Sequence, residues 1–93
     1  VVFAADHGVA TEGVSAWPRA VTGLMIANIR DGGAASSVLA RASGTELRLV
    51  DCGASGPAVA PAPHVSVARV ANGTRNLARG PAMDVAQFDA AWA

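Results

Sequence analysis

The sequence predicts an α/β domain with a layered, mostly parallel β-sheet and flanking helices, an arrangement of the Rossmann-like kind. Segments with the apolar patterns of strands alternate with segments of helical periodicity, in the order strand, two helices, strand, strand, helix. The first strand-like segment is continuously apolar, which is typical of strands in a parallel sheet. Glycine-containing breaks and a helix-starting signature separate the segments. These three observations predict one α/β fold for the chain.

The first strand is expected at Val1–Ala5, covered on both faces by other parts of the protein, and a glycine-containing loop follows it. Pro18 fits the first turn of a helix, because its missing N–H would be unpaired there in any case. This helix is expected to extend to about Arg30. Its apolar residues recur near helical spacing and predict an inward-facing stripe of Val21, Leu24, Met25 and Ile29.

A second helix is expected at Ala34–Ala42, after the glycine pair that ends the first helix. Val38 and Leu39 are predicted to face inward, and Gly44 lies just past the helix end, where glycine is favoured. No internal repeat interrupts this order of elements.

Two further strands and a last helix complete the predicted order. Glu46–Asp51 alternates partially and His64–Val70 alternates cleanly, so both are expected to be strands. The Pro/Ala/Gly segment between them cannot hold regular structure. Asp84 is followed three residues later by Gln87, a capping-box signature that starts the last helix.

The composition narrows the classes of function. The seven positive charges are all Arg, the formal net charge is zero and no basic stripe exists, which excludes nucleic acid as the main partner. The single cysteine, Cys52, cannot form an internal disulfide, so a reduced cytoplasmic compartment is expected. No apolar run reaches the roughly 18 to 20 residues of a transmembrane helix.

The chain is apolar for a free-standing domain, with 52% hydrophobic and 15% charged residues, and both of its ends fall inside element patterns. We therefore expect residues 1–93 to be a fragment of one longer α/β domain, incomplete by itself.

Polar residues follow the ends of two predicted strands. Asp6 and His7 come after the first strand, and Asp51 and Cys52 after the second. In a parallel sheet these positions share the edge where ligands bind, so the residues are candidates for a site. The alternative is that they only cap turns by bonding backbone N–H groups. Position by itself does not separate these two interpretations.

Several other kinds of site find no support. The two histidines and the acids lack metal-ligand spacing. Ser15 lacks the G-x-S-x-G frame of a hydrolase nucleophile, and no glycine-rich phosphate loop occurs. Cys52 fits a small buried hydrophobe better than a nucleophile, and Met25 fits the core stripe of its helix.

The motifs taken together resemble a known family. The stretches "FAADHGVATEGVSAWPRAVTGLMIANIRDGGAASSVLARASGTELRLVDCG" and "VARVANGTRNLARGPAM" resemble the nicotinate-nucleotide–dimethylbenzimidazole phosphoribosyltransferase family of cobalamin biosynthesis. The shared features are a D-H-G-V turn, G-V-S/A-x-x-P-x-x-V-T, a glycine break, V-x-D-x-G and G-T-x-N-x-x-x-G-P-A-M, in this order. The family often has Gln near Leu24 or Met25, which this chain lacks.

The resemblance implies transfer of ribose 5-phosphate from nicotinate mononucleotide to 5,6-dimethylbenzimidazole, giving α-ribazole phosphate and nicotinate. A carboxylate takes the benzimidazole proton as a general base. The resemblance places the catalytic Glu and the phosphate loop in a C-terminal part beyond this chain, so it implies no catalytic residue here. Glu12 and Glu46 are not assigned that role, and the 93 residues by themselves are expected to be inactive.

The resemblance also implies a pocket for the aromatic base, with Trp17 at its rim, formed by Ser15, Trp17, Pro18, Thr22 and Met25. Asp6, His7, Gly8 and Asp51 are expected to hold loop 8–17 in place through hydrogen bonds to its backbone. Neither a cofactor nor a metal is implied, and the full-length enzyme is expected to be a homodimer.

Two alternatives stay open at this point. One is a non-catalytic α/β module for nucleotide binding or protein interaction that keeps the scaffold. The other is a paralogue that acts on a different aromatic base.

Overall fold

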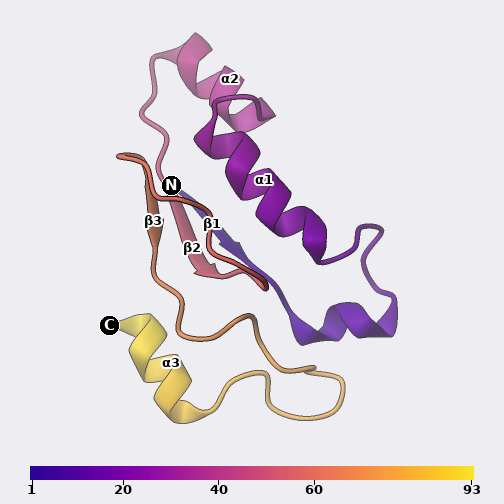
Figure 1. The fold of residues 1–93 in the computed structure, drawn as a ribbon. Helices are drawn as coiled ribbons and strands as arrows, with labels where there is room; N and C mark the ends of the chain where they lie inside the picture. Colours follow the sequence, from indigo (N-terminus) through magenta and orange to yellow (C-terminus); the bar gives the residue numbers. More distant parts are fainter.

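The computed structural model describes all residues, 1–93, as a parallel sheet with helices (Figure 1), which confirms the predicted α/β class. The capping box predicted at the start of the last helix is present, with Gln87 N–H donating to Asp84 Oδ1 at 2.8 Å and Asp84 N–H donating to Gln87 Oε1 at 3.0 Å. In chain order the elements are β1 (Val2–Ala5), the 3₁₀ helix η1 (Gly8–Glu12), α1 (Ala20–Arg30), α2 (Ala35–Ser43), β2 (Leu49–Gly53), β3 (Val65–Val67) and α3 (Val85–Trp92).

The sheet has the order β1-β2-β3, and both neighbouring pairs are parallel. Ala4 lies opposite Asp51, whereas Ala5 lies opposite Gly53, so Cys52 is an extra residue that bulges β2 near its end. The carboxyl ends of β1 and β2 therefore meet at one edge of the sheet. This edge is where the segments after both strands come together.

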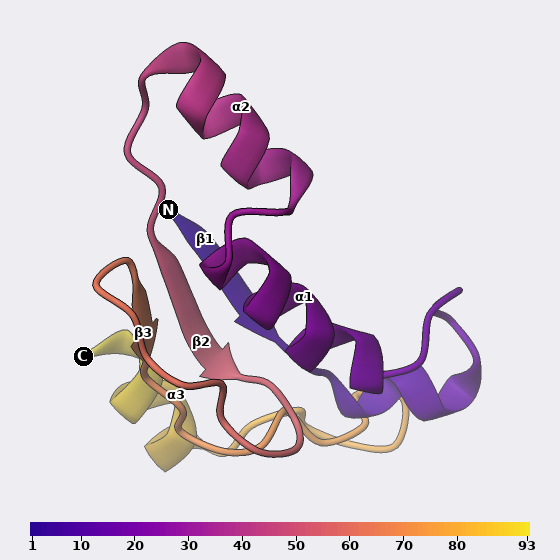
Figure 2. The same cartoon turned by 45° about the horizontal axis from the view of Figure 1, so that its top comes forward.

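One helix forms the core with the sheet. Figures 1 and 2 show α1 lying across one face of the strands and α2 beyond one end of the sheet; α3 lies below the other end in Figure 1 and behind β3 in Figure 2. The buried apolar side chains are few, and they come from α1, the sheet and the segments next to it: Ile26, Ile29, Ala34, Leu49, Ala54 and Val65. Val59 and Ala62, from the segment between β2 and β3, pack against this core in place of a crossover helix.

The predicted inward stripes of both helices are partly wrong. Ile26 (1% exposed) and Ile29 contact the sheet from α1, whereas Leu24 is 69% exposed and Met25 is 43% exposed. Compared with the prediction, α1 is turned about its own axis, so that residues 22, 26 and 29 face the strands. In α2 the buried residue is Ser37, whose hydroxyl donates to the Ile29 carbonyl at 3.3 Å.

Val38 and Leu39 of α2 are exposed, contrary to the prediction, because α2 lies beyond the strands and has no sheet surface to cover. The expectation that the first strand is covered on both faces is also wrong within this structure. β1 is an edge strand, and Phe3 is 71% exposed on the face that α1 does not cover.

Element boundaries differ most where the backbone turns. β2 begins and ends later than predicted and includes Cys52, and β3 ends at Val67 instead of residue 70. η1 forms inside the segment expected to be a loop, because the backbone folds back after His7 with an Ala10 N–H to His7 C=O bond of 3.1 Å. No helix of the chain combines the length and the hydropathy needed to cross a membrane.

A large apolar surface remains uncovered. The accessible surface is 6047 Å², against about 5,000 Å² for a compact protein of this mass. α3 has no buried residue, and its Phe88 and Trp92 rings stack with 5.9 Å between centroids while both stay exposed. Patches of this kind mark surfaces that other protein covers.

We predict that the 93-residue chain, expressed by itself, self-associates and binds a hydrophobic dye. Phe88→Gln with Trp92→Gln should reduce dye fluorescence while changing the free energy of unfolding by only about 0.5 kcal/mol, because both side chains are exposed. Size-exclusion chromatography and dye titration measure the two effects. A strictly monomeric chain without dye binding would contradict the prediction.

Candidate functional site

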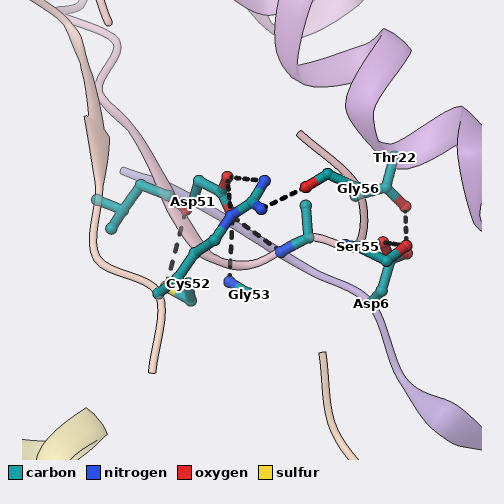
Figure 3. A network of polar contacts seen from close by, with 10 residues as sticks. Asp6, Thr22, Asp51, Cys52, Gly53, Ser55 and Gly56 are labelled. Carbon is teal, nitrogen blue, oxygen red and sulfur yellow. Dashed lines mark hydrogen bonds and ion pairs between the residues drawn. The ribbon is translucent and has the colours of Figure 1, made fainter. Parts of the chain in front are cut away.

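Asp6 lies at the carboxyl end of β1, 4% exposed, and joins three separate parts of the chain. Its Oδ1 accepts the Thr22 hydroxyl at 2.6 Å, and its Oδ2 accepts the Ser55 N–H at 2.6 Å and hydroxyl at 2.7 Å (Figure 3). Its backbone C=O accepts the Thr74 N–H at 3.0 Å. The expected hydrogen bonds from this carboxylate to the backbone of loop 8–17 are not formed. The carboxylate holds α1 and the loop after β2 instead.

Asp51 lies inside β2 and is 1% exposed, so it does not face an open crevice. Its Oδ2 forms an ion pair with Arg69, with Nε and Nη2 each at 2.8 Å, and its Oδ1 accepts the N–H groups of Gly53 and Ala54. Arg69 Nη1 then donates to the Gly56 carbonyl at 2.6 Å. This network shapes the turn over residues 53–56, which presents Ser55 to the Asp6 carboxylate (Figure 3).

Both buried carboxyls have pKa values below the ordinary one. Burial raises the pKa of Asp6, but hydrogen bonds from Thr22 and Ser55 and the charge of Arg19 outweigh it. Burial likewise raises the pKa of Asp51, and the Arg69 hydrogen bonds, the two backbone N–H groups and the Arg69 charge reverse the effect. Both groups are therefore ionised acceptors, which are poorly suited to take up a proton.

His7 and Gly8 attach the start of η1 to the segment around residue 74. His7 Nδ1 lies 3.2 Å from the Thr74 hydroxyl, and the Gly8 N–H donates to the Thr74 carbonyl at 3.0 Å. A Cβ on Gly8 would lie 2.5 Å from the Asn76 backbone nitrogen, so only glycine fits this close approach. Asn76 Nδ2 also donates to Glu12 Oε1 at 2.6 Å.

A cavity of about 430 Å³ opens beside this edge, between η1, the loop after it and α1. Ten of its sixteen lining residues are hydrophobic, and Asp6 is the one carboxylate among them. All five residues predicted for the base pocket line it, namely Ser15, Trp17, Pro18, Thr22 and Met25. Trp17 is 72% exposed, as expected for a residue at the rim.

Two details limit the chemistry of the lining residues. The Ser15 hydroxyl donates to the Trp17 carbonyl at 3.0 Å and accepts the Trp17 N–H at 3.2 Å, so it braces its own loop. The Thr22 hydroxyl donates its proton to Asp6 and so cannot donate it to a ligand.

No group of three or more His, Cys, Asp or Glu side chains is placed to hold a metal ion. Burial, and then the Asp51 charge, raises the pKa of the Cys52 thiol, which makes it a poor nucleophile.

Sequence reasoning did not identify Ser55, Arg69 and Thr74 as parts of this edge. Ser55 lies in a Pro/Ala/Gly segment without periodicity, and Arg69 was expected only as a strand residue. Thr74 belongs to the G-T-x-N motif, which was the one available signal that the segment has a specific partner.

Known proteins resemble the chain over most or all of its length. A family model described as phosphoribosyltransferase matches residues 1–93. The chain is similar to the nicotinate-nucleotide–dimethylbenzimidazole phosphoribosyltransferase of Azotobacter vinelandii, with 54% identity over 92% of this chain and 24% of that protein. That of Solidesulfovibrio magneticus is 52% identical over 97% of this chain and 25% of that protein.

Among solved structures, CobT from Thermus thermophilus superposes with a TM-score of 0.91 and 42% identity. The match covers 96% of this chain and 26% of that one. The chain thus spans about a quarter of the length of the relatives it matches.

We predict that acid weakens folding through Asp6 and Asp51. Because both pKa values lie below the ordinary 3.8, the unfolded chain binds more protons near that pH. The contribution of these groups is complete above the ordinary pKa and is lost as the pH falls through their folded values. Urea unfolding of the full-length protein at pH 7, 4 and 3 measures the loss.

Asp51→Asn leaves Arg69 without its ion pair and should cost about 3 to 5 kcal/mol at pH 7. It should also flatten the acid dependence. The matched control is Asp89→Asn on α3, an exposed residue that should leave both stability and acid dependence as in the parent. Stability that stays constant down to pH 3 would show that the two carboxylates are not the acid-sensitive groups.

Proposed function

Because the chain belongs to the nicotinate-nucleotide–dimethylbenzimidazole phosphoribosyltransferase family, we propose that the whole protein transfers ribose 5-phosphate from nicotinate mononucleotide to 5,6-dimethylbenzimidazole. The products are α-ribazole phosphate and nicotinate. The observation that carries this proposal is the mostly apolar cavity at the carboxyl edge of the sheet, lined by the residues of the D-H-G and G-V-S motifs. A flat aromatic base needs apolar walls and few polar groups.

The reaction is a displacement at the anomeric carbon of the ribose. One benzimidazole nitrogen attacks this carbon, and the bond to the pyridinium nitrogen breaks with its electron pair going to that nitrogen. The leaving nicotinate needs no proton, because its ring nitrogen becomes neutral. The proton on the other benzimidazole nitrogen goes to a carboxylate that acts as general base.

The carboxylates near the cavity are already engaged. Both oxygens of Asp6 accept hydrogen bonds, Asp51 is paired with Arg69, and Glu12 accepts Asn76 and Arg79. A general base has to reach the substrate with a free oxygen and a suitable pKa. We therefore place the base outside this chain and give these residues the task of shaping the pocket.

The pocket residues divide by their contacts. Pro18 and Met25 offer apolar walls, and Trp17 closes the rim over the ring. Ser15 braces the loop that carries Trp17, and Thr22 attaches α1 to Asp6. That bond fixes the distance between α1, which carries the base-binding wall, and the carboxyl end of β1.

The proposal also covers the compartment of the enzyme, its assembly and its need for a cofactor. The lone cysteine and the absence of a disulfide suit a cytoplasmic protein. The exposed apolar side chains of β1 and α3 offer surface that the rest of the protein, or a second subunit of a homodimer, would cover. The chemistry written above needs no cofactor.

The proposal is tested by assaying the full-length protein with nicotinate mononucleotide and dimethylbenzimidazole, following nicotinate and α-ribazole phosphate by chromatography. Met25→Asp, which places a charge against the ring, should raise KM for the base at least about 10-fold. The 93-residue chain should show no turnover. A full-length protein that binds these substrates without transfer would favour the non-catalytic module, and preference for another base would favour a paralogue.

Asp6→Asn should weaken base binding without moving the ionisation that limits turnover. The amide keeps one oxygen for Thr22, but its NH₂ faces the Ser55 N–H and loses that bond, so we expect KM for the base to rise about 10-fold. The pH profile of kcat should keep its limiting pKa on the acidic side. If that ionisation disappears while KM holds, Asp6 is the general base.

A further inference from the structure

Arg19, at the N-terminal boundary of α1, lines the cavity and has no protein partner. Its Nε is buried and makes no hydrogen bond. Each of the other six arginines has an acceptor within the chain, supplied by Asp31, Gly32, Glu46, Asp51, Asp84 and Glu12 in turn. Burying part of a guanidinium in apolar surroundings without a hydrogen-bond acceptor is energetically unfavourable. We therefore expect Arg19 to have an acceptor that this chain does not supply.

The neighbouring Asp6 does not fill this role. Its two oxygens already accept three hydrogen bonds from Thr22 and Ser55, and no ion pair joins it to Arg19. Arg19 lies close to the Gly73 backbone, since its Nη2 is 3.0 Å from the point that a Cβ on Gly73 would occupy. Gly73 has a φ of +90° and leaves the room for this contact. The guanidinium therefore lies beside the carboxyl edge of the sheet, with a buried Nε that has no acceptor.

The surroundings restrict the chemistry of the missing acceptor. A guanidinium offers a planar fork of N–H groups that pairs with a carboxylate or a phosphate in two parallel hydrogen bonds. A phosphate carries up to two negative charges, whereas the cavity has one guanidinium, the Asp6 carboxylate and a mostly apolar lining, so a singly charged carboxylate fits it better. An aromatic ring that carries a carboxylate combines the apolar body and the anionic end that these residues fit.

We infer that Arg19 binds the pyridine carboxylate of the nicotinate nucleotide and selects the acid over the amide; this inference rests on the proposed function. Met25, on the base-binding wall, lies six residues further along α1, or about 9 Å along the helix axis. The leaving pyridine and the incoming base approach the anomeric carbon from opposite sides, so adjoining places for two rings along α1 suit the reaction. A nucleotide with an amide in place of the carboxylate leaves the guanidinium unpaired, which is a strong basis for discrimination.

The test uses the full-length protein with dimethylbenzimidazole and two ribosyl donors, nicotinate mononucleotide and nicotinamide mononucleotide. The parent should prefer the acid in kcat/KM. Arg19→Gln should lower kcat/KM for the acid about 10- to 100-fold and leave that for the amide unchanged, the size expected for a hydrogen bond to a charged group. The matched control is Arg48→Gln, because Arg48 is exposed, pairs with Glu46 and lies away from the cavity.

Three results would overturn the inference. The parent could use both donors equally, Arg19→Gln could reduce both equally, or Arg48→Gln could cause the same loss. If Arg19→Gln fails to fold, Arg19→Lys keeps the charge without the fork and should still lose part of the preference. Calorimetric titration with nicotinate and with nicotinamide tests the same contact without turnover. Nicotinate that binds through Arg19 in a protein without transferase activity would overturn the proposed function and retain the inference.

Discussion

The buried Asp6 carboxylate is the interaction on which the site depends. It accepts hydrogen bonds from Thr22 and Ser55, residues that lie 16 and 49 positions away in the chain. A buried carboxylate is unfavourable unless its oxygens are satisfied, and each hydrogen bond to a charged acceptor contributes roughly 1.5 to 3 kcal/mol. The carboxylate therefore determines how far α1 stands from the strand edge, and with it the shape of the cavity.

The loops around Asp6 are organised by polar contacts because the core is small. No helix connects β2 to β3, and only α1 packs on the sheet. The Asp51–Arg69 pair shapes residues 53–56 through the Gly53, Ala54 and Gly56 backbone, and Thr74 secures the start of η1 through His7 and Gly8. These bonds are short-range and directional, so they place Ser55 and η1 more narrowly than apolar contact could. The same dependence on ionised carboxylates makes this edge sensitive to acid.

The role proposed for each side chain at the cavity depends on whether its polar atoms already have hydrogen-bond partners within the chain. The Asp6 carboxylate in the cavity lining has both oxygens occupied, whereas the buried Nε of Arg19 has no acceptor. The proposed roles of these residues, binding and orienting substrates, follow from the apolar walls and the one guanidinium of the cavity. Asp6, the one carboxylate in the cavity lining, has both oxygens in hydrogen bonds, which is why the general base is proposed to lie outside these residues.

The sequence by itself determined the class of the fold and the residues that line one cavity at the carboxyl edge of the sheet. Continuous and alternating apolar runs identified the strands, Asp84 and Gln87 identified the start of α3, and the polar residues after β1 marked the edge at which the candidate site lies. These features are local, because propensity, capping and strand-end position depend on neighbours in the chain. The five residues expected in the base pocket do line one cavity, although binding there stays a prediction.

Only the tertiary structure decided which faces are buried and what the polar residues contact. Periodicity marked Leu24, Val38 and Leu39 as inward, but a helix buries only the side that meets a neighbour, and α2 meets no strand. Asp6 bonds Ser55 rather than its own loop, because the parallel register of β1 and β2 brings the two strand ends together. Such long-range partners depend on the packing of distant segments, which no local pattern encodes.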